Sequence, residues 1–326
     1  MTDSNIILFE WEHNNCFMIA AMQCIFNLEH AVDHFMESLQ HLRKLQIYDA
    51  EEYKQFEDSV IRNVAVVVKF IRENSVKMDV ETLNIRKLLK SICTNDIGSQ
   101  IVYGRGGDTK SFLFKFISGI EEEVKKFNEI VERKGYEAKV GKMSEFGYFY
   151  GSYMLIYDPC PSCNFKYEDE TSKFSFLLLG GNATCIKEAL KDNLSDGVSW
   201  CSGCNNNKCT YHKCYNQFPQ YLFCQLRRGG IPKLPKLTIE KDFEMDCYGG
   251  EKYKLKLLGV ALDGTGHTTA LIRKDDKWYY CDEIRYHRTI DVTKSVDDQY
   301  LTVKENAIPY QGYILFYNCY QLMNDN

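Results

Sequence analysis

The sequence predicts an α+β protein whose N-terminal part is helical and whose C-terminal part consists mostly of strands. Apolar residues recur at intervals close to 3.6 residues over much of residues 16–131, which is typical of amphipathic helices. From about residue 145, short runs rich in aromatic and aliphatic residues predict strands instead. Because helices and strands are segregated along the chain, we expect the α+β class. The 326 residues, 44% of them hydrophobic, are enough for a substantial core.

The helical part divides into three predicted segments. Residues 16–45 fit one long helix, with apolar side chains at every third or fourth position. Residues 52–94 fit further helix, again with an apolar periodicity. The glycine-rich stretch 103–108 interrupts the pattern, and residues 110–131 resume it.

The predicted strands lie in the second half of the chain, where no internal repeat is found. Each is a short run of aromatic and aliphatic residues between polar segments. We expect strands at residues 148–156, 174–179, 218–223, 253–262, 270–273, 278–281 and 313–317.

The composition narrows the cellular setting and the classes of partner. The net charge of −5 and the isoelectric point near 5.9 do not suggest a basic nucleic-acid-binding surface. No apolar run approaches the ~18 residues of a membrane span, and the first ten residues lack the pattern of a signal peptide. Fourteen cysteines without such a signal indicate a reducing compartment. We therefore expect an intracellular monomer, cytoplasmic or nuclear, with no nucleic-acid or membrane partner.

Two C-x2-C pairs in the middle of the chain predict a metal site. Cys160 and Cys163 form one pair, Cys201 and Cys204 form the other, and each pair lies near a predicted strand. Four thiolates bind zinc tetrahedrally and leave no open position for chemistry. We expect one structural zinc ion here; the alternative is a set of cysteines without a metal. Three further residues could hold a second ion or replace one ligand: Cys209, His212 and Cys214.

A cysteine near the N-terminus and a histidine near the C-terminus form a candidate catalytic pair. Cys16 stands at the start of a predicted apolar helix, where unpaired N–H groups favour a thiolate. His267, in the glycine-flanked run 264–269, could act as its base. A turn at residues 274–277 would fold the next strand back, so that Asp282 could orient His267. Each residue alone also fits a plainer role: a small buried cysteine, a turn histidine and a solvated carboxylate.

Five sequence boxes, in order, resemble those of the ubiquitin-specific protease catalytic domain, a papain-like deubiquitinase. Residues 14–23 (NNCFMIAAMQ) resemble the family's cysteine box, roughly N-x-G-N-T-C-[FY]-M-N-[SA]-x-x-Q. Residues 266–271 (GHTTAL) and 278–283 (WYYCDE) resemble its histidine box, G-H-Y-T-A-Y followed by W-Y-x-F-D-D. The middle, strand and closing boxes correspond to residues 106–113, 219–228 and 312–317. The resemblance covers about residues 10–318.

The resemblance implies a hand-like papain-like fold of thumb, palm and fingers in one catalytic domain over residues 1–326. The expected parts are a helical thumb at about 10–145, zinc-bearing fingers at 146–225 and a β-rich palm at 226–326. It also implies hydrolysis of the isopeptide or peptide bond after the C-terminal glycine of ubiquitin, with ubiquitin or ubiquitinated proteins as partners. By motif position, Cys16 is the nucleophile, His267 the base and Asp282 the residue that orients His267.

Two positions near the nucleophile depart from the family pattern. The asparagine five residues before the cysteine, which helps to stabilise the oxyanion, is replaced by Trp11, and the asparagine after Phe-Met is replaced by Ile19. The Trp11 indole N–H could serve as the donor, and coronavirus papain-like proteases show a similar Trp-x-x-Asn-Asn-Cys run. The backbone N–H of Cys16, and Asn14, could complete the oxyanion hole. The alternative is that Trp11 only packs at the helix entry.

The diglycine end of ubiquitin requires a narrow channel, for which two loops are candidates. One loop precedes the base and contains Gly264 and Gly266. The other, residues 106–108, aligns with family residues that face the channel. Asp108 could bind the backbone or the arginine of the ubiquitin tail. It could equally cap the helix that begins near Thr109.

Two other functions fit the same motifs. The altered positions Trp11 and Ile19 suit a ubiquitin-binding module with little catalysis. The same chemistry could also act on a ubiquitin-like modifier or on a viral polyprotein site that ends in Gly-Gly. An active deubiquitinase is favoured because all three triad positions hold competent residues and because the middle and closing boxes are close to those of the cellular family.

Overall fold

The computed structural model of the protein divides into two compact units. The described residues are 6, 8–10, 14–44, 59–74, 85–94, 101–133, 147–180, 183–226, 238–264, 266–282, 290–292, 296–297, 302–305 and 308–322. The units are Met1–Tyr148, Leu258–Asp297 and Thr302–Phe316 for the first, and Phe149–Leu257, Asp298–Leu301 and Tyr317–Asn326 for the second. The three-way division into thumb, fingers and palm stays a prediction. Across these described ranges, every helix is too short or too polar to span a lipid bilayer.

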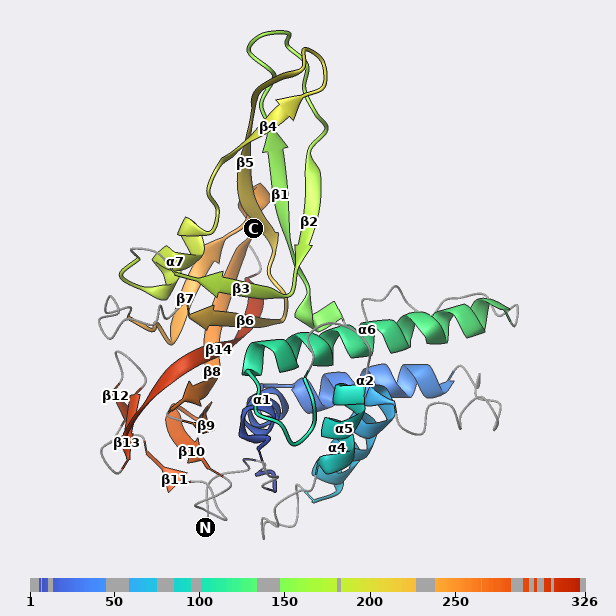
Figure 1. Ribbon diagram of the computed structural model, residues 1–326, viewed down its shortest axis with the longest axis vertical. Coiled ribbons are helices and arrows are strands. Elements are labelled where there is room, and N and C mark those ends of the chain that lie inside the picture. The colour runs from blue at the N-terminus through green and yellow to red at the C-terminus, as the bar shows by residue number, and fades with distance from the viewer. Residues whose placement is uncertain are drawn as a thin grey trace. The chain divides into compact units, whose positions relative to one another are not determined.

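The first unit contains five helices of the described chain, which lie together in Figure 1. They are α1 (Cys16–Phe26), α2 (Ala31–Lys44), α4 (Val60–Asn74), α5 (Arg86–Thr94) and α6 (Thr109–Arg133). Every residue of α1 after Cys16 is buried, as expected for a helix that is apolar on all sides. The predicted helix over residues 110–131 is confirmed by α6.

The predicted single helix over residues 16–45 is wrong, because the chain turns between α1 and α2. The side-chain amide of Asn27 donates to the Gln23 carbonyl over 2.7 Å, and His30 has a left-handed φ of 63°. A left-handed residue does not continue a right-handed helix. Leu28 lies within the turn and is nevertheless buried. The apolar period therefore runs through the turn and conceals it.

A carboxylate from α6 satisfies the first N–H groups of α4. Glu123 accepts hydrogen bonds from the backbone N–H of Val60 over 2.7 Å and of Ile61 over 2.8 Å. These are among the donors that a helix leaves unpaired at its N-terminus. Burial raises the pKa of the Glu123 carboxyl, and these two N–H groups oppose that shift. The start of α4 thus depends on a residue from another part of the chain.

A sheet completes the first unit. Its strands pair in the order β11-β10-β9-β8-β14-β13-β12, and α1 packs against β9. The strands are β8 (Lys252–Asp263), β9 (Thr268–Lys274), β10 (Lys277–Cys281), β11 (Ile290–Asp291), β12 (Val296–Asp297), β13 (Thr302–Glu305) and β14 (Ile308–Leu322). The chain passes into the second unit within β8 and within β14.

β9 and β10 form the predicted hairpin. Its turn residues, Asp275 and Asp276, have φ values of 50° and 59°, a pair of positive values that two-residue hairpin turns require and that aspartate tolerates. The strands are antiparallel and in register. Continued by one residue, this register sets Asp282 opposite Thr269. His267 lies two residues further along and on the same side of the strand, which brings it within reach of Asp282.

The second unit contains a narrow sheet of order β2-β1-β5-β4, whose strands run side by side in Figure 1. They are β1 (Gly151–Tyr157), β2 (Glu170–Phe174), β4 (Gly197–Cys201) and β5 (Asn206–Gln217). β3 pairs in parallel with β6, β7 pairs with β8, and α7 packs near β3. The remaining bounds are β3 (Phe176–Leu179), β6 (Tyr221–Leu226), β7 (Asp242–Asp246), α7 (Ile186–Asp192) and the 3-10 turns η2 (Gly147–Phe149) and η3 (Tyr248–Gly250).

Seven of the described elements were not predicted from the sequence, namely β4, β5, β7, β11, β12, β13 and α7, and several predicted strand ends were misplaced. The predicted strand 174–179 is two strands, which end and begin on either side of Ser175. β5 is polar along most of its length, yet it pairs with β1 on one side and β4 on the other. Backbone pairing with two neighbours holds such a strand without an apolar pattern.

Candidate active site and metal site

His267 and Asp282 form a hydrogen bond in the first unit. The Nε2 atom of His267 lies 3.2 Å from Oδ1 of Asp282. The Asp282 side chain is 0% exposed and that of His267 is 15% exposed, so water screens the pair little. Because Nε2 faces the carboxylate, Nδ1 is the ring nitrogen that can exchange a proton with a nucleophile. The predicted proximity of base and orienting residue is thus present.

Tyr280 holds the second oxygen of the same carboxylate. Its hydroxyl donates to Asp282 Oδ2 over 3.2 Å, and its ring is buried. No role for this tyrosine was predicted from the sequence. The strand period could have indicated one, because residues 280 and 282 point to the same side of a strand. Asp282 is fixed from two sides, which in turn fixes the orientation of His267.

A short loop places His267 at the start of β9. The N–H of Gly264 donates to the His267 carbonyl over 2.9 Å, which closes the loop. Gly266 has a φ of 79°, a conformation that glycine adopts without steric cost. The two glycines therefore shape the loop. Their contact with a substrate stays a prediction.

Cys16 is the first residue of α1, as predicted. The half-buried thiol lies at the positive end of the helix dipole, and the first turn contains no acidic residue. α1 packs against β9, the strand that His267 immediately precedes. Among the described residues, the thiol forms no hydrogen bond with His267. Catalytic hydrogen bonds are often long or misaligned before substrate binds.

The candidate oxyanion donors are only partly within the described chain. Trp11 lies outside the described residues. Asn14 is described and exposed, and its side-chain Nδ2 donates to the Gly104 carbonyl over 3.2 Å. One hydrogen of this amide is thus engaged by a neighbouring loop. The role of Asn14 in an oxyanion hole stays a prediction.

Asp108 caps α6. Its Oδ1 accepts a hydrogen bond from the backbone N–H of Ser111 over 2.9 Å, and α6 begins at Thr109. This is the geometry of an N-cap residue that binds the third helical N–H. The carboxylate is also exposed. Binding of a ubiquitin tail by Asp108 stays a prediction.

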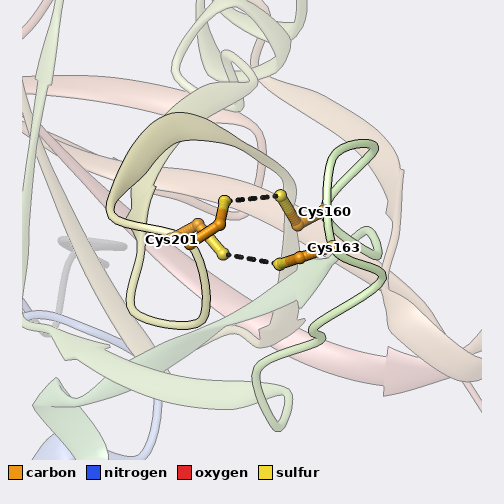
Figure 2. Close-up of side chains that lie close together, drawn as sticks. Cys160, Cys163 and Cys201 are labelled. Carbon is orange, nitrogen blue, oxygen red and sulfur yellow. Dashed lines mark hydrogen bonds between the residues drawn. The ribbon is translucent and has the colours of Figure 1, made fainter.

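Four cysteines of the second unit meet in one cluster. The sulfurs of Cys160, Cys163, Cys201 and Cys204 all lie within 4.8 Å of one another. Cys160 and Cys204 are 3.7 Å apart and Cys163 and Cys201 are 3.5 Å apart. Figure 2 shows the Cys160–Cys163 loop facing the loop of Cys201. Zinc–sulfur bonds of ~2.3 Å in a tetrahedron require sulfurs about 3.8 Å apart, so the cluster fits a metal ion of this kind.

The protonation of these thiols favours a cation at the centre. The backbone N–H of Ser162 is the main cause that lowers the pKa of the Cys160 thiol to about 6. Burial, followed by the Cys160 sulfur, raises the pKa of Cys204 to about 12. Ionisation of one thiol of the cluster thus raises the pKa of another. Four thiolates can coexist only where a bound cation compensates their charge.

The three additional candidate ligands have other surroundings. Cys209 is buried against Cys160 and Cys201, but it is not among the four sulfurs of the cluster. Cys214 donates to the Met154 carbonyl over 3.7 Å. Both ring nitrogens of His212 lie 3.1 Å from carboxylates, those of Asp158 and Asp196. Within the described ranges, the structure therefore gathers no second group of metal ligands.

A cysteine at a helix N-terminus and a histidine held by a buried carboxylate are the components of a cysteine hydrolase site. The chain belongs to the ubiquitin carboxyl-terminal hydrolase family, whose model matches residues 11–317. The match includes Cys16, His267 and Asp282, together with the four clustered cysteines. The family resemblance inferred from the motifs is therefore confirmed.

Solved structures confirm the fold. One is the SAGA DUB module Ubp8/Sgf11/Sus1/Sgf73 bound to monoubiquitin, with a TM-score of 0.66 and 16% identity over 98% of this chain and 70% of that chain. Another is the same module bound to ubiquitin aldehyde, with a TM-score of 0.65 and 15% identity over 99% of this chain and 72% of that chain. The predicted α+β fold of this hydrolase class is thus correct.

Two curated proteins match a short stretch of the chain. They are a probable tRNA pseudouridine synthase D 2 of Methanococcus maripaludis strain S2, 38% identical over 82 residues, and a probable tRNA pseudouridine synthase D of strain C5, 35% identical over 82 residues. The match covers 25% of this chain and 20% of each of those proteins. Because it spans a fifth of their length, it does not establish a family.

Proposed function

We propose that the protein is a cysteine-dependent deubiquitinase, which hydrolyses the isopeptide or peptide bond after the C-terminal glycine of ubiquitin. The observation that carries the proposal is the His267–Asp282 pair, which adjoins the strand against which the Cys16 helix packs. Membership of the ubiquitin carboxyl-terminal hydrolase family supports the substrate. So do the folds of the SAGA DUB modules bound to monoubiquitin and to ubiquitin aldehyde.

The proposed reaction assigns one step to each residue of the triad. His267 takes the thiol proton of Cys16, and the thiolate attacks the carbonyl carbon of the terminal glycine. Asp282 accepts the Nε2–H of His267 and stabilises the imidazolium. The C–N bond breaks as His267 protonates the leaving amine, which leaves a thioester on Cys16. Water, deprotonated by His267, then hydrolyses the thioester and frees the ubiquitin carboxylate.

The developing oxyanion and the substrate tail require further residues. We assign the backbone N–H of Cys16 and the indole N–H of Trp11 as oxyanion donors, with Asn14 as a third. We assign Gly264, Gly266 and Asp108 to the channel for the diglycine tail. In this arrangement Gly264 and Gly266 carry no side chains that would block the channel. The channel then needs to be only wide enough for the two terminal glycines of ubiquitin.

We also propose that the cysteine cluster holds one structural zinc ion through Cys160, Cys163, Cys201 and Cys204. Bound zinc would cross-link the β1–β2 loop, which supplies Cys160 and Cys163, to the end of β4 and the loop after it, which supply Cys201 and Cys204. The four protein ligands fill the tetrahedron, so we assign the metal no step in the reaction. We further propose an intracellular location, because none of the fourteen cysteines forms a disulfide, as a reducing compartment would ensure. We also propose that the protein acts as a monomer.

A ubiquitin that carries a C-terminal electrophile tests the function. We expect it to form one covalent adduct at Cys16, none with Cys16→Ala, and we expect the wild-type protein to release a fluorophore from the ubiquitin C-terminus. Adduct formation without turnover would indicate a ubiquitin-binding module of little activity. Reaction only with a different diglycine modifier or peptide would exclude ubiquitin as the substrate.

A further inference from the structure

The loop before α6 is tied to the start of α1 by two side chains. Nδ2 of Asn14 donates to the Gly104 carbonyl over 3.2 Å, and the Gly104 N–H donates to Oδ1 of Asn15 over 2.9 Å. Gly104 has a left-handed φ of 78°, which favours glycine. The two residues that precede Cys16 in sequence therefore hold both polar backbone groups of Gly104.

Asn15 is the N-cap residue of α1, but its side chain does not cap the helix. An N-cap asparagine ordinarily accepts a hydrogen bond from the second or third helical N–H. Here Oδ1 binds Gly104 instead, and Nδ2 is buried without a hydrogen-bond partner in the described part of the chain. The reverse amide orientation would set Nδ2 against the Gly104 N–H, so the oxygen must face the loop. An unsatisfied buried amide lowers stability, and the bond to the loop explains why asparagine stands there.

The same loop also rests on the residue that follows the nucleophile. A Cβ added to Gly107 would lie 2.8 Å from Cζ of Phe17, so glycine allows the loop to lie against the ring. Phe112 of α6 packs edge-on against Phe17, with ring centroids 6.3 Å apart. The loop is thus held at Gly104 and at Gly107 by residues on either side of Cys16.

We propose that Asn15 is a positioning residue that fixes the loop of residues 102–108 beside Cys16 and thereby sets the affinity for the ubiquitin tail. The inference rests on the proposed function, in which this loop forms one wall of the tail channel. The Asn15 side chain is buried, with its oxygen engaged by Gly104. Its effect therefore falls on substrate binding and not on the reactivity of the thiol.

The variant Asn15→Ser tests this role, because serine caps a helix well but is too short to reach Gly104. We expect KM for a ubiquitin C-terminal amide substrate to rise about 3- to 10-fold, the size of one neutral hydrogen bond. We expect kcat, and the pH dependence of Cys16 alkylation by iodoacetamide, to stay unchanged. Gly104→Ala strains the loop from the other side and should raise KM alike. The double variant should add little to either single effect.

Asn27→Ser is the matched control, since Asn27 lies at the other end of α1, where its side-chain amide donates to the Gln23 carbonyl. It should lower the melting temperature and leave KM alone. A lowered melting temperature with unchanged KM in Asn15→Ser and Gly104→Ala would overturn the proposal. So would altered alkylation with unchanged KM, which would place the effect on the thiol. If wild-type protein is alkylated at Cys16 but does not hydrolyse the ubiquitin substrate, the proposed function fails first and this inference falls with it.

Discussion

The two cysteine sites of the protein are assembled in opposite ways. At the cysteine cluster, two short turns each supply a C-x2-C pair, and the spacing within each turn already sets two sulfurs together. At the candidate active site, Cys16 comes from the first described helix and the His267–Asp282 pair from a C-terminal hairpin. Packing of α1 against β9 is what brings these segments near each other. Local geometry therefore specifies each C-x2-C pair, and the pairing of β5 with β1 and β4 joins the two pairs. The active site, in contrast, depends entirely on the packing of a helix against a distant hairpin.

The sharpest way to test the active-site half of this comparison is to remove the triad residues. We expect Cys16→Ala or His267→Ala to lower kcat by ~10⁶-fold, and Asp282→Asn by about 10³–10⁴-fold, because an orienting residue contributes less than the nucleophile. Tyr280→Phe removes one hydrogen bond to the carboxylate and should cost far less. Turnover of a ubiquitin C-terminal amide measures each loss, and ubiquitin binding should survive in Cys16→Ala. Near-normal turnover in His267→Ala would refute the assignment.

Removal of one clustered thiol tests whether the cysteine cluster needs all four of its proposed zinc ligands. We expect Cys160→Ala to lose the zinc and to expose the β1–β2 and β4–β5 loops to protease, since structural zinc supplies ~10–16 kcal/mol in small zinc domains. Cys214→Ala is the matched control, because its thiol lies outside the cluster. Elemental analysis and limited proteolysis report the two effects. A wild-type protein purified under reducing conditions without any metal would contradict the proposal.

Asp108 belongs to the helical half of the first unit. Two variants of it distinguish its structural role as the cap of α6 from a role in binding the ubiquitin tail. Asp108→Ala should lower the free energy of unfolding by ~0.5–2 kcal/mol through loss of the cap, whereas Asp108→Asn should keep it. If the carboxylate also binds the ubiquitin tail, Asp108→Asn raises KM while the melting temperature stays constant. Unchanged KM in both variants would leave only the cap.

The smallest expected effect concerns His212 of β5, whose ring lies between the carboxylates of Asp158 and Asp196. Hydrogen bonding to Asp196, and then the charges of Asp196 and Asp158, raise the pKa of His212 above its ordinary 6.5. The folded protein thus binds this proton more tightly than the unfolded chain does. The stabilisation is complete below about pH 6.5 and is lost as the pH rises through the folded-state pKa.

Thermal unfolding of His212→Asn against wild type over this pH range measures the effect. The melting temperatures should differ at acidic pH and converge at alkaline pH. His30→Asn is the matched control, because His30 is exposed in the first unit and its Nε2 lies farther from a carboxylate, 3.9 Å from that of Glu29. Asparagine also accepts the left-handed φ of this position. A difference that is constant with pH would show that the ion pairs at His212 do not stabilise the fold.

The sequence alone specified those features of the protein that depend on residues close together along the chain. The helical periodicity of α6, the segregation of helices from strands and the β9–β10 hairpin were all predictable, because side-chain period and turn chemistry act over a few residues. Cys16 at a helix start and the two C-x2-C pairs followed in the same way. The family motifs then linked His267 and Asp282 to Cys16.

Only the tertiary structure decided the contacts between residues far apart in sequence. The buried Glu123 carboxylate at the start of α4 and the bond from Gly104 to Asn15 leave no local pattern that marks their partners. The turn after α1 was hidden for a related reason, since burial of Leu28 preserves the apolar period across it. Periodicity reports which side of an element is buried, but a hydrogen bond depends on which groups meet once the elements have packed.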